Sequence, residues 1–200
     1  MKPQALLFDI GNVIVHFDFD PALEKVAALS DVPAGEIFTR ISSFKTALET
    51  GAMSDDEFLT QCMALIQFRG SRDEFAQCWN DIFTANQPMV DFITSMKGKV
   101  PLYLLSNTNG LHKDFLFENF PVFRLFDGGI YSHEAKSMKP HEPIFQAAVS
   151  AYDLEPSRTF YIDDLADNIR TGEKLGFVSH LYDAREHDRF LQDAQAWLGC

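Results

Sequence analysis

Short apolar runs alternate with longer segments of helical periodicity along most of this chain. The apolar runs cover residues 5–8, 100–105, 159–162 and 178–181, with a shorter run near 129–131. Such runs are typical of buried strands, whereas the segments between them have the spacing of amphipathic helices. The alternation predicts an α/β fold with a parallel sheet that is covered by helices on both faces.

The segment from residue 15 to residue 86 departs from this alternation, because its pattern is helical throughout. Asp20 followed by Pro21 is typical of a capping residue and the first helical position. The sequences Ser-Asp-Asp-Glu at 54–57 and Ser-Arg-Asp-Glu at 71–74 are capping boxes, each followed by an apolar stripe. We therefore expect a block of helices inserted directly after the first strand.

Polar side chains stand where three of the apolar runs end: Asp9, the pair Ser106–Asn107 and the pair Asp163–Asp164. Ligands bind at the carboxyl ends of strands in open α/β sheets, so these side chains are candidates for one site. A carboxylate there can act as a nucleophile, a metal ligand or both. The alternatives are an Asp that opens a turn, a helix cap for the Asp pair, and a turn for the Ser–Asn pair.

Lys139 lies between the second and third of these positions, in the sequence Met-Lys-Pro. A lysine in the site would neutralise a phosphate and a carboxylate nucleophile, whereas an exposed surface position is the commoner state of lysine. Pro143 indicates the first turn of a helix. His112 follows the Ser–Asn turn and is the best candidate for substrate contact among histidines that are more often structural.

The order Asp9, Ser106, Lys139, Asp163–Asp164 resembles the motif order of the haloacid dehalogenase (HAD) superfamily, most of whose members are phosphatases. The sequence Asp-Ile-Gly-Asn-Val at the first motif and Leu-Ser-Asn-Thr-Asn-Gly-Leu-His at the second are similar to a bacterial branch that acts on sugar phosphates. The α-glucose-1-phosphate phosphatases are its best-known members.

This resemblance implies a molecule in two parts. Residues 1–14 and 87–200 would form a Rossmann-like α/β core with a parallel sheet, and residues 15–86 an inserted all-helical cap. It also implies that the chain hydrolyses a small phosphorylated metabolite, which we expect to be a sugar phosphate. The reaction would pass through an aspartyl-phosphate intermediate on Asp9.

The resemblance also gives each motif residue a role. Catalysis is assigned to Asp9, Ser106 and Lys139, and substrate binding to Ser106, Asn107, Lys139 and His112. The implied cofactor is Mg²⁺, with the expected ligands Asp9, the main-chain carbonyl of Gly11, Asp163 and Asp164. Magnesium takes oxygen ligands, which these residues supply.

Gly11 departs from the superfamily pattern, because most of its phosphatases carry a second Asp at this position. That Asp serves as general acid and base, a contribution worth roughly 10²–10⁴ in rate. Three interpretations follow: a substrate with a good leaving group such as an anomeric phosphate, a substitute acid such as Asp18 or His16, or a binding or regulatory module with little turnover.

A metal-independent 2-haloacid dehalogenase is the alternative enzyme, since those proteins also lack the second Asp. The adjacent Asp163 and Asp164 favour the metal-dependent phosphatase. Neighbouring carboxylates repel each other and raise each other's pKa when no cation lies beside them.

Composition narrows the range of partners and compartments. The 200 residues include 17 Lys or Arg and 29 Asp or Glu, for a formal net charge of −12, which disfavours nucleic-acid and anionic-membrane partners. No apolar stretch reaches the length of a membrane span, and the start of the chain lacks the pattern of a signal peptide. Cys62, Cys78 and Cys200 are odd in number and lack metal-ligand spacing, and Cys62 and Cys78 are expected to be buried reduced thiols. These features predict a cytoplasmic enzyme and leave its oligomeric state open.

Overall fold

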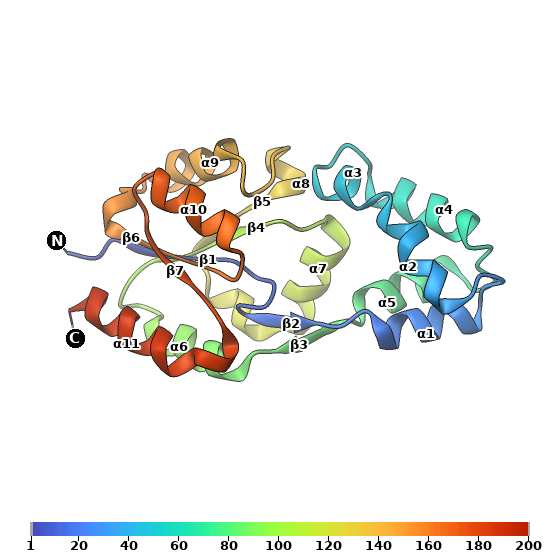
Figure 1. The fold of residues 1–200 in the computed structure, drawn as a ribbon, viewed down its shortest axis with the longest axis horizontal. Helices are drawn as coiled ribbons and strands as arrows, with labels where there is room; N and C mark the ends of the chain where they lie inside the picture. Colours follow the sequence, from blue (N-terminus) through green and yellow to red (C-terminus); the bar gives the residue numbers. More distant parts are fainter. Residues whose placement is uncertain (1, 200) are drawn as a thin grey trace.

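The computed structural model describes residues 2–199 and contains a five-stranded parallel sheet, which lies in the left half of Figure 1. The strand order is β5–β4–β1–β6–β7, and every neighbouring pair is parallel. The strands are β1 (Ala5–Phe8), β4 (Leu102–Ser106), β5 (Gly128–Tyr131), β6 (Thr159–Asp163) and β7 (Val178–Leu181). Each coincides with one of the apolar runs, so the predicted parallel sheet is confirmed.

Helices cover both faces of this sheet. They are α6 (Gln87–Met96), α7 (Gly110–Asn119), α8 (Ser132–Ala135), α9 (Glu142–Tyr152), α10 (Ala166–Lys174) and α11 (His187–Leu198). Short 3₁₀ segments lie at η1 (Pro121–Leu125), η2 (Pro156–Arg158) and η3 (Ala184–Glu186). We call the sheet and these helices the core lobe.

Alternate residues of each strand pack against opposite helical layers. Leu6 and Phe8 of β1 belong to the apolar cluster that includes residues of α6, α7 and α11. Ala5 and Leu7 belong to the other cluster, with residues of α9 and α10. Successive side chains on a strand point to opposite faces, and parallel sheets are buried on both. The predicted α/β fold is therefore confirmed in its layers as well as in its strands.

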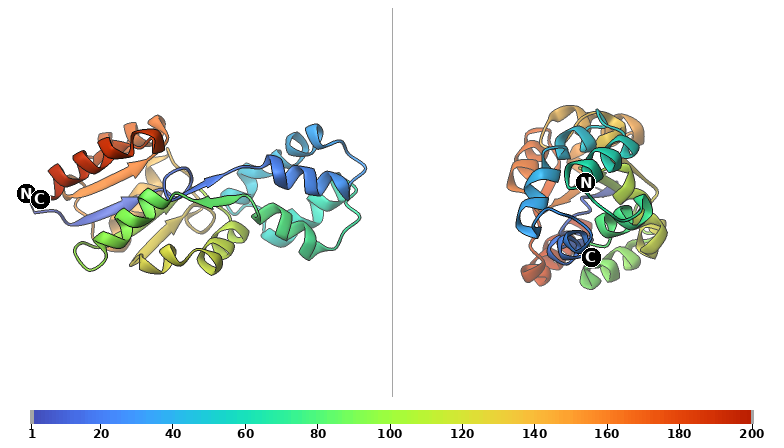
Figure 2. Two further views of the ribbon diagram at one scale, coloured as in Figure 1. Left: turned by 90° about the horizontal axis from the view of Figure 1, so that it is seen from below. Right: turned by 90° about the vertical axis from the view of Figure 1, so that its right-hand side faces the viewer.

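The inserted helices form a second body, the helical lobe, with an apolar cluster of its own. They are α1 (Asp20–Ala28), α2 (Ala34–Ser42), α3 (Lys45–Glu49), α4 (Asp55–Leu65) and α5 (Arg72–Asn80). Their cluster is centred on the buried side chains of Ile37, Phe58 and Phe75. Figure 2 shows the two lobes at opposite ends of an elongated molecule, with both termini at the far end of the core lobe.

A two-stranded antiparallel ribbon joins the lobes. It consists of β2 (Val15–Phe17) and β3 (Phe83–Ala85), with Val15 opposite Ala85. The prediction that residues 15–86 are helical throughout is therefore wrong at both ends of the segment. Three-residue strands are too short to show a period, and their pairing joins positions far apart in the chain, so a local pattern cannot reveal it.

The predicted helix starts are confirmed with one exception. Ser54 and Ser71 cap α4 and α5 in complete capping boxes, and α9 begins with Pro143 in its first turn. The interpretation of Asp20 as a capping residue is wrong by one position, because Phe19 is the capping residue of α1 and Asp20 is its first helical residue. The main-chain N–H of Asp20 instead donates to Oδ1 of Asp18, at 3.0 Å.

None of the described helices has the length and apolar character needed to cross a membrane. Cys62 is buried and Cys78 is half-buried, and both are free thiols, whereas Cys200 lies outside the described residues. Burial raises the pKa of the Cys62 thiol to about 12, so this cysteine is a protonated core residue.

Candidate active site

The carboxyl ends of three neighbouring strands bring the predicted polar residues together. Asp9 directly follows β1, Ser106 ends β4 and Asp163 ends β6. Asp9, Asp163 and Asp164 each present a carboxylate oxygen within 4.8 Å of the others. Because the strands are adjacent in the sheet, Asp9 and Asp163 lie close together although they are about 150 residues apart along the chain.

Lys139 is the cation of this group. Its buried ammonium lies 2.8 Å from Oδ1 of Asp9 and 2.6 Å from Oδ2 of Asp163. Burial opposes the charge of Lys139, but the carboxylates of Asp163 and Asp9 outweigh it and raise the lysine pKa. The surface position that is common for lysine is therefore excluded.

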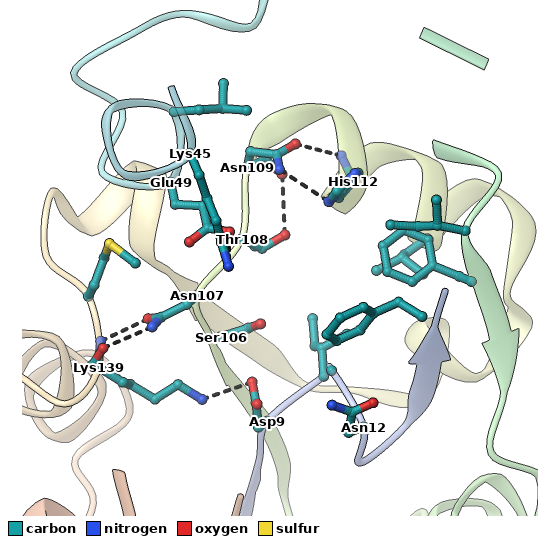
Figure 3. Close-up of a pocket in the computed structure, with 18 of the residues that line it drawn as sticks. Asp9, Asn12, Lys45, Glu49, Ser106, Asn107, Thr108, Asn109, His112 and Lys139 are labelled. Atoms are coloured by element: carbon teal, nitrogen blue, oxygen red, sulfur yellow. Dashed lines mark hydrogen bonds and ion pairs between the residues drawn. The ribbon is translucent and has the colours of Figure 1, made fainter. Parts of the chain in front are cut away.

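Asn107 holds the lysine in place through its main chain. Its Nδ2 donates to the carbonyl oxygen of Lys139 at 2.9 Å, and its Oδ1 accepts from the main-chain N–H of Lys139 at 2.8 Å (Figure 3). Both polar groups of the amide are engaged in this way. Asn107 thus positions Lys139, while Ser106, the last residue of β4, lines the cavity.

Asp163 is fully buried and is surrounded by donors. Its Oδ2 accepts from Lys139 and from the hydroxyl of Tyr161 at 2.6 Å each. Its Oδ1 accepts from Nδ2 of Asn168 and from the main-chain N–H of Leu165 at 2.9 Å each. Burial alone would raise the pKa of Asp163, but Lys139 and these hydrogen bonds lower it, so the carboxylate is held ionised.

Asp164 and Asp9 are less fully paired and face the cavity. Nδ2 of Asn12 donates to Oδ2 of Asp164 at 3.0 Å. Burial raises the pKa of Asp164, and it raises the pKa of Asp9 to about 7 although Lys139 opposes the shift. Three acidic groups beside one lysine are an oxygen-rich set that fits a divalent cation such as Mg²⁺.

The turn after Asp9 derives its shape from Asn12 rather than from Gly11. Asn12 has φ +53°, whereas Gly11 is not in the left-handed region. Asparagine is among the few residues that adopt this conformation readily. A Cβ atom at Gly11 would lie 3.1 Å from Cε1 of Phe17, so the aromatic ring occupies the space beside the missing carboxylate.

A cavity of about 430 Å³ lies between the lobes, above the strand ends. Asp9, Ser106, Lys139 and Asp164 form its floor on the core side. The helical lobe and the ribbon contribute an aromatic wall made of Phe17, Phe19, Phe38 and Trp79. Lys45 and Glu49 of α3 also line the cavity, and Figure 3 shows both side chains pointing from the helix toward the core side.

The site agrees with what the chain is similar to. A family model described as haloacid dehalogenase-like hydrolase matches residues 3–176. The chain belongs to the haloacid dehalogenase-like hydrolase family. A D-ribitol-5-phosphate phosphatase from Bacteroides thetaiotaomicron is 30% identical over 184 residues, which cover 86% of this chain and 88% of the relative. The resemblance inferred from the order of the motifs is thereby confirmed.

Solved structures support the same assignment. A HAD family enzyme from Bacteroides thetaiotaomicron in complex with magnesium and inorganic phosphate has a TM-score of 0.82 at 26% identity, covering 92% of this chain and 96% of that chain. An L-2-haloacid dehalogenase from Xanthobacter autotrophicus has a TM-score of 0.64 at 13% identity, covering 88% of this chain and 76% of that chain. The second likeness is one of fold alone.

In this hydrolase His112 joins the two lobes. Its ring stacks on Trp79 of α5 at 5.2 Å, and Nε2 lies 3.2 Å from the carbonyl oxygen of Trp79. Nδ1 lies 3.1 Å from Nδ2 of Asn109, and burial lowers the pKa of His112 to about 4, so the ring is neutral. Both nitrogens have protein partners, which leaves only the ring face for the contact with substrate that the sequence predicts.

The two residues proposed as substitute acids lie away from the cavity lining. His16 lines a separate hollow with Asn12 and Asp164, and Asp18 is exposed and accepts the N–H of Asp20. Alternation along β2 and the residues after it explains this arrangement, because Phe17 and Phe19 are the residues that face the cavity.

Sequence reasoning missed the supporting residues Tyr161 and Asn12 and the cavity residues of the helical lobe. Tyr161 had a usable signal, because a residue two positions before Asp163 on a strand shares its face. Lys45 and Glu49 had no such signal in the sequence. Polar residues on a short helix usually lie on the surface, and only the position of the helical lobe shows that these two line the cavity.

Proposed function

We propose that this protein is a Mg²⁺-dependent phosphomonoesterase that acts on a small sugar phosphate. The observation that carries the proposal is Asp9 at the floor of a cavity between two lobes, with Lys139 at 2.8 Å and Asp164 beside it. A carboxylate nucleophile, a fixed cation and an oxygen-rich metal site are the parts that phosphoryl transfer needs. The phosphatase relative and the magnesium and phosphate complex of the related enzyme support the same chemistry.

In this mechanism one oxygen of Asp9 attacks phosphorus, and the bond from phosphorus to the ester oxygen breaks. Water then attacks the aspartyl-phosphate, and inorganic phosphate and free Asp9 result. Lys139 and the hydroxyl of Ser106 contact the phosphate oxygens, while Asn107 positions the lysine. The departing alkoxide must take up a proton, and Gly11 supplies no acid for it.

Asp9, Asp164 and the main-chain carbonyl of Gly11 would hold the magnesium ion, with Asp163 orienting Lys139 from behind. When bound, the ion neutralises the negative charge of the phosphate and the carboxylates. Asp163 is the least available ligand of the predicted set, because donors already surround both of its oxygens.

We further propose that residues 1–14 and 87–200 act as the catalytic core and residues 15–86 as a cap that closes over the substrate. The aromatic wall and α3 cover the phosphate site from the helical lobe. Closure of such a lid excludes water and completes the contacts to the substrate.

A panel of small phosphomonoesters, assayed for phosphate release with Mg²⁺ and with excess chelator, tests this function. We expect turnover of at least one sugar phosphate with Mg²⁺ and its loss in chelator. Undiminished turnover in chelator would contradict the metal assignment. Halide release from 2-haloacids in chelator would establish the dehalogenase, and no turnover of either substrate class would favour a binding module.

A further inference from the structure

Glu49 is a carboxylate in the cavity that has no fixed hydrogen-bond partner. Its side chain is 13% exposed, and the nearest cation, Nζ of Lys45, is 3.9 Å away at a largely exposed position. No described residue donates a hydrogen bond to it. Figure 3 shows its carboxylate pointing into the space above the core side of the site.

This state differs from that of the three carboxylates on the core side of the site. Asp163 accepts four hydrogen bonds, and Asp164 and Asp9 have donors from Asn12 and Lys139. A largely buried carboxylate without protein donors is unfavourable, because it keeps only the few water contacts that the cavity allows and gains no others. Burial raises the pKa of Glu49, as expected for a carboxylate in that condition. Donors that arrive with a ligand would remove this penalty.

The position of Glu49 indicates which part of a ligand it would meet. Lys139 and Ser106 lie on the core side of the cavity, whereas Glu49 comes from α3 on the opposite lobe. A phosphate bound at Lys139 therefore directs the rest of the substrate toward Glu49. The aromatic rings of Phe17 and Phe38, 42% and 41% exposed, form an apolar wall of the same space.

We propose that Glu49 binds hydroxyl groups on the carbon skeleton of the substrate. It makes the enzyme specific for phosphate esters whose skeleton is polyhydroxylated and carries no charge of its own. The inference rests on the proposed function and narrows its substrate class. A carboxylate accepts hydrogen bonds only, so it selects hydroxyl donors and repels a second acidic group. The aromatic wall suits the C–H faces of such a skeleton, which are apolar between the hydroxyls.

The test compares Glu49→Gln with the parent on two substrates. One is the sugar phosphate that the parent hydrolyses best, and the other is p-nitrophenyl phosphate, which has no hydroxyl groups. We expect kcat/KM for the sugar phosphate to fall about 10–100-fold, mainly through KM, because a hydrogen bond to a charged group is lost. The rate on the aryl phosphate should change less than about twofold, which also controls for folding.

Two further arms sharpen the result. Glu36→Gln is the matched control, because Glu36 lies on α2, pairs with Arg40 and does not line the cavity. It should leave both substrates unchanged. Phosphoglycolate, which carries a carboxylate as a second acidic group beside its phosphate, should be hydrolysed faster by Glu49→Gln than by the parent, because the repulsion is reduced.

The outcomes separate the inference from the function on which it rests. Equal losses on the sugar and aryl phosphates, or no loss on either, would overturn the role of Glu49 while the phosphatase stands. A parent enzyme that hydrolyses neither substrate with Mg²⁺ would overturn the proposed function, and the inference with it.

Discussion

The two sides of the cavity are built in opposite ways. On the core side, Lys139 lies between Asp9 and Asp163 at less than 3 Å from each. On the helical side, the only ion pair between cavity-lining residues that the structure describes joins Lys45 and Glu49 at 3.9 Å, with the lysine largely exposed. The core side is therefore set before any ligand arrives, whereas the helical side depends on the ligand for its partners.

Local structure explains this difference. The core residues stand at the ends of strands whose main-chain hydrogen bonds fix their positions, and preorganised charges are the most effective catalytic groups. Lys45 and Glu49 stand on α3, a helix of 5 residues. Under the proposed function, substrate specificity can thus change in the helical lobe without disturbing the chemistry on the core side.

The largest expected effect is on the core side. Asp9→Asn should lower phosphate release by at least about 10³-fold, because an amide cannot form the aspartyl-phosphate. The thermal midpoint should be unchanged or higher. Burial holds the pKa of Asp9 near 7, above that of an unfolded carboxyl, so its ionisation opposes folding at higher pH.

Asp167→Asn is the matched control for this variant, because Asp167 is exposed and does not line the cavity. It should keep the activity of the parent. If Asp9→Asn retained activity within tenfold of the parent, the nucleophile would lie elsewhere.

The second prediction concerns closure of the helical lobe. The lobes touch where Nζ of Lys136 donates to the carbonyl oxygen of Gly51 at 2.9 Å and where Trp79 stacks on His112. We expect a small sugar phosphate to be hydrolysed at least about 100-fold faster than a phosphorylated protein, because closure excludes bulky groups. Parallel assays of phosphate release measure this ratio.

Lys136→Met should reduce that ratio by favouring the open state, while p-nitrophenyl phosphate reports on the intact core. Equal rates on the small substrate and the phosphoprotein in the parent would contradict a closing cap.

The third prediction concerns Gly11. Without an acid there, the rate should depend steeply on the basicity of the leaving group, so aryl and anomeric phosphates should exceed primary-alcohol phosphates. Gly11→Asp should raise the rate on primary-alcohol phosphates about tenfold or more relative to aryl phosphates, measured as paired kcat/KM values. Its backbone permits Asp, although the ring of Phe17, at 3.1 Å from the new Cβ, must shift.

Gly11→Ala adds the same Cβ without the carboxylate and controls for that shift. If the parent showed no dependence on the leaving group, the absence of an acid at Gly11 would not limit the rate. Variants of Asp18, and of His16, which lines the adjoining hollow with Asp164, would then test for a substitute acid.

The smallest expected effect is on stability at the contact between the lobes. Burial lowers the pKa of His112 to about 4, below its value of about 6.5 in an unfolded chain, so the unfolded state binds more protons between these values. The contribution of neutral His112 to the free energy of unfolding is therefore fully present well above pH 6.5, and it is lost as the pH falls from 6.5 toward 4. Between pH 7.5 and 5.5 we expect His112 to account for about 1 kcal/mol of that loss.

Urea denaturation at the two pH values measures the effect. The loss on acidification should be smaller in His112→Gln than in the parent, whatever the stability of the variant at pH 7.5. An identical loss in both proteins would show that His112 does not titrate in this way.

Much of the core lobe could be predicted from the sequence. The runs that became β1, β4 and β6 are apolar because both faces of the sheet are buried, and the residues that follow them are polar because the strands end at the site. Asp9, Ser106 and Asp163 thus had a local signal at each position. Their order along the chain supplied the family, which the family model confirms.

Tertiary structure alone decided which of these polar groups face the cavity and which are enclosed by hydrogen-bond donors. Tyr161, Leu165 and Asn168, which donate to Asp163, lie within five residues of it, but only the fold shows that Lys139 is the fourth donor and that Asp164 faces the cavity. Segments that are distant in the chain meet in the ribbon, in the stacking of Trp79 on His112, and in the cavity that Glu49 lines together with Asp9. The local pattern of apolar and polar residues predicts which side chains are buried, because buried positions favour apolar residues. It does not predict which distant residue each side chain contacts.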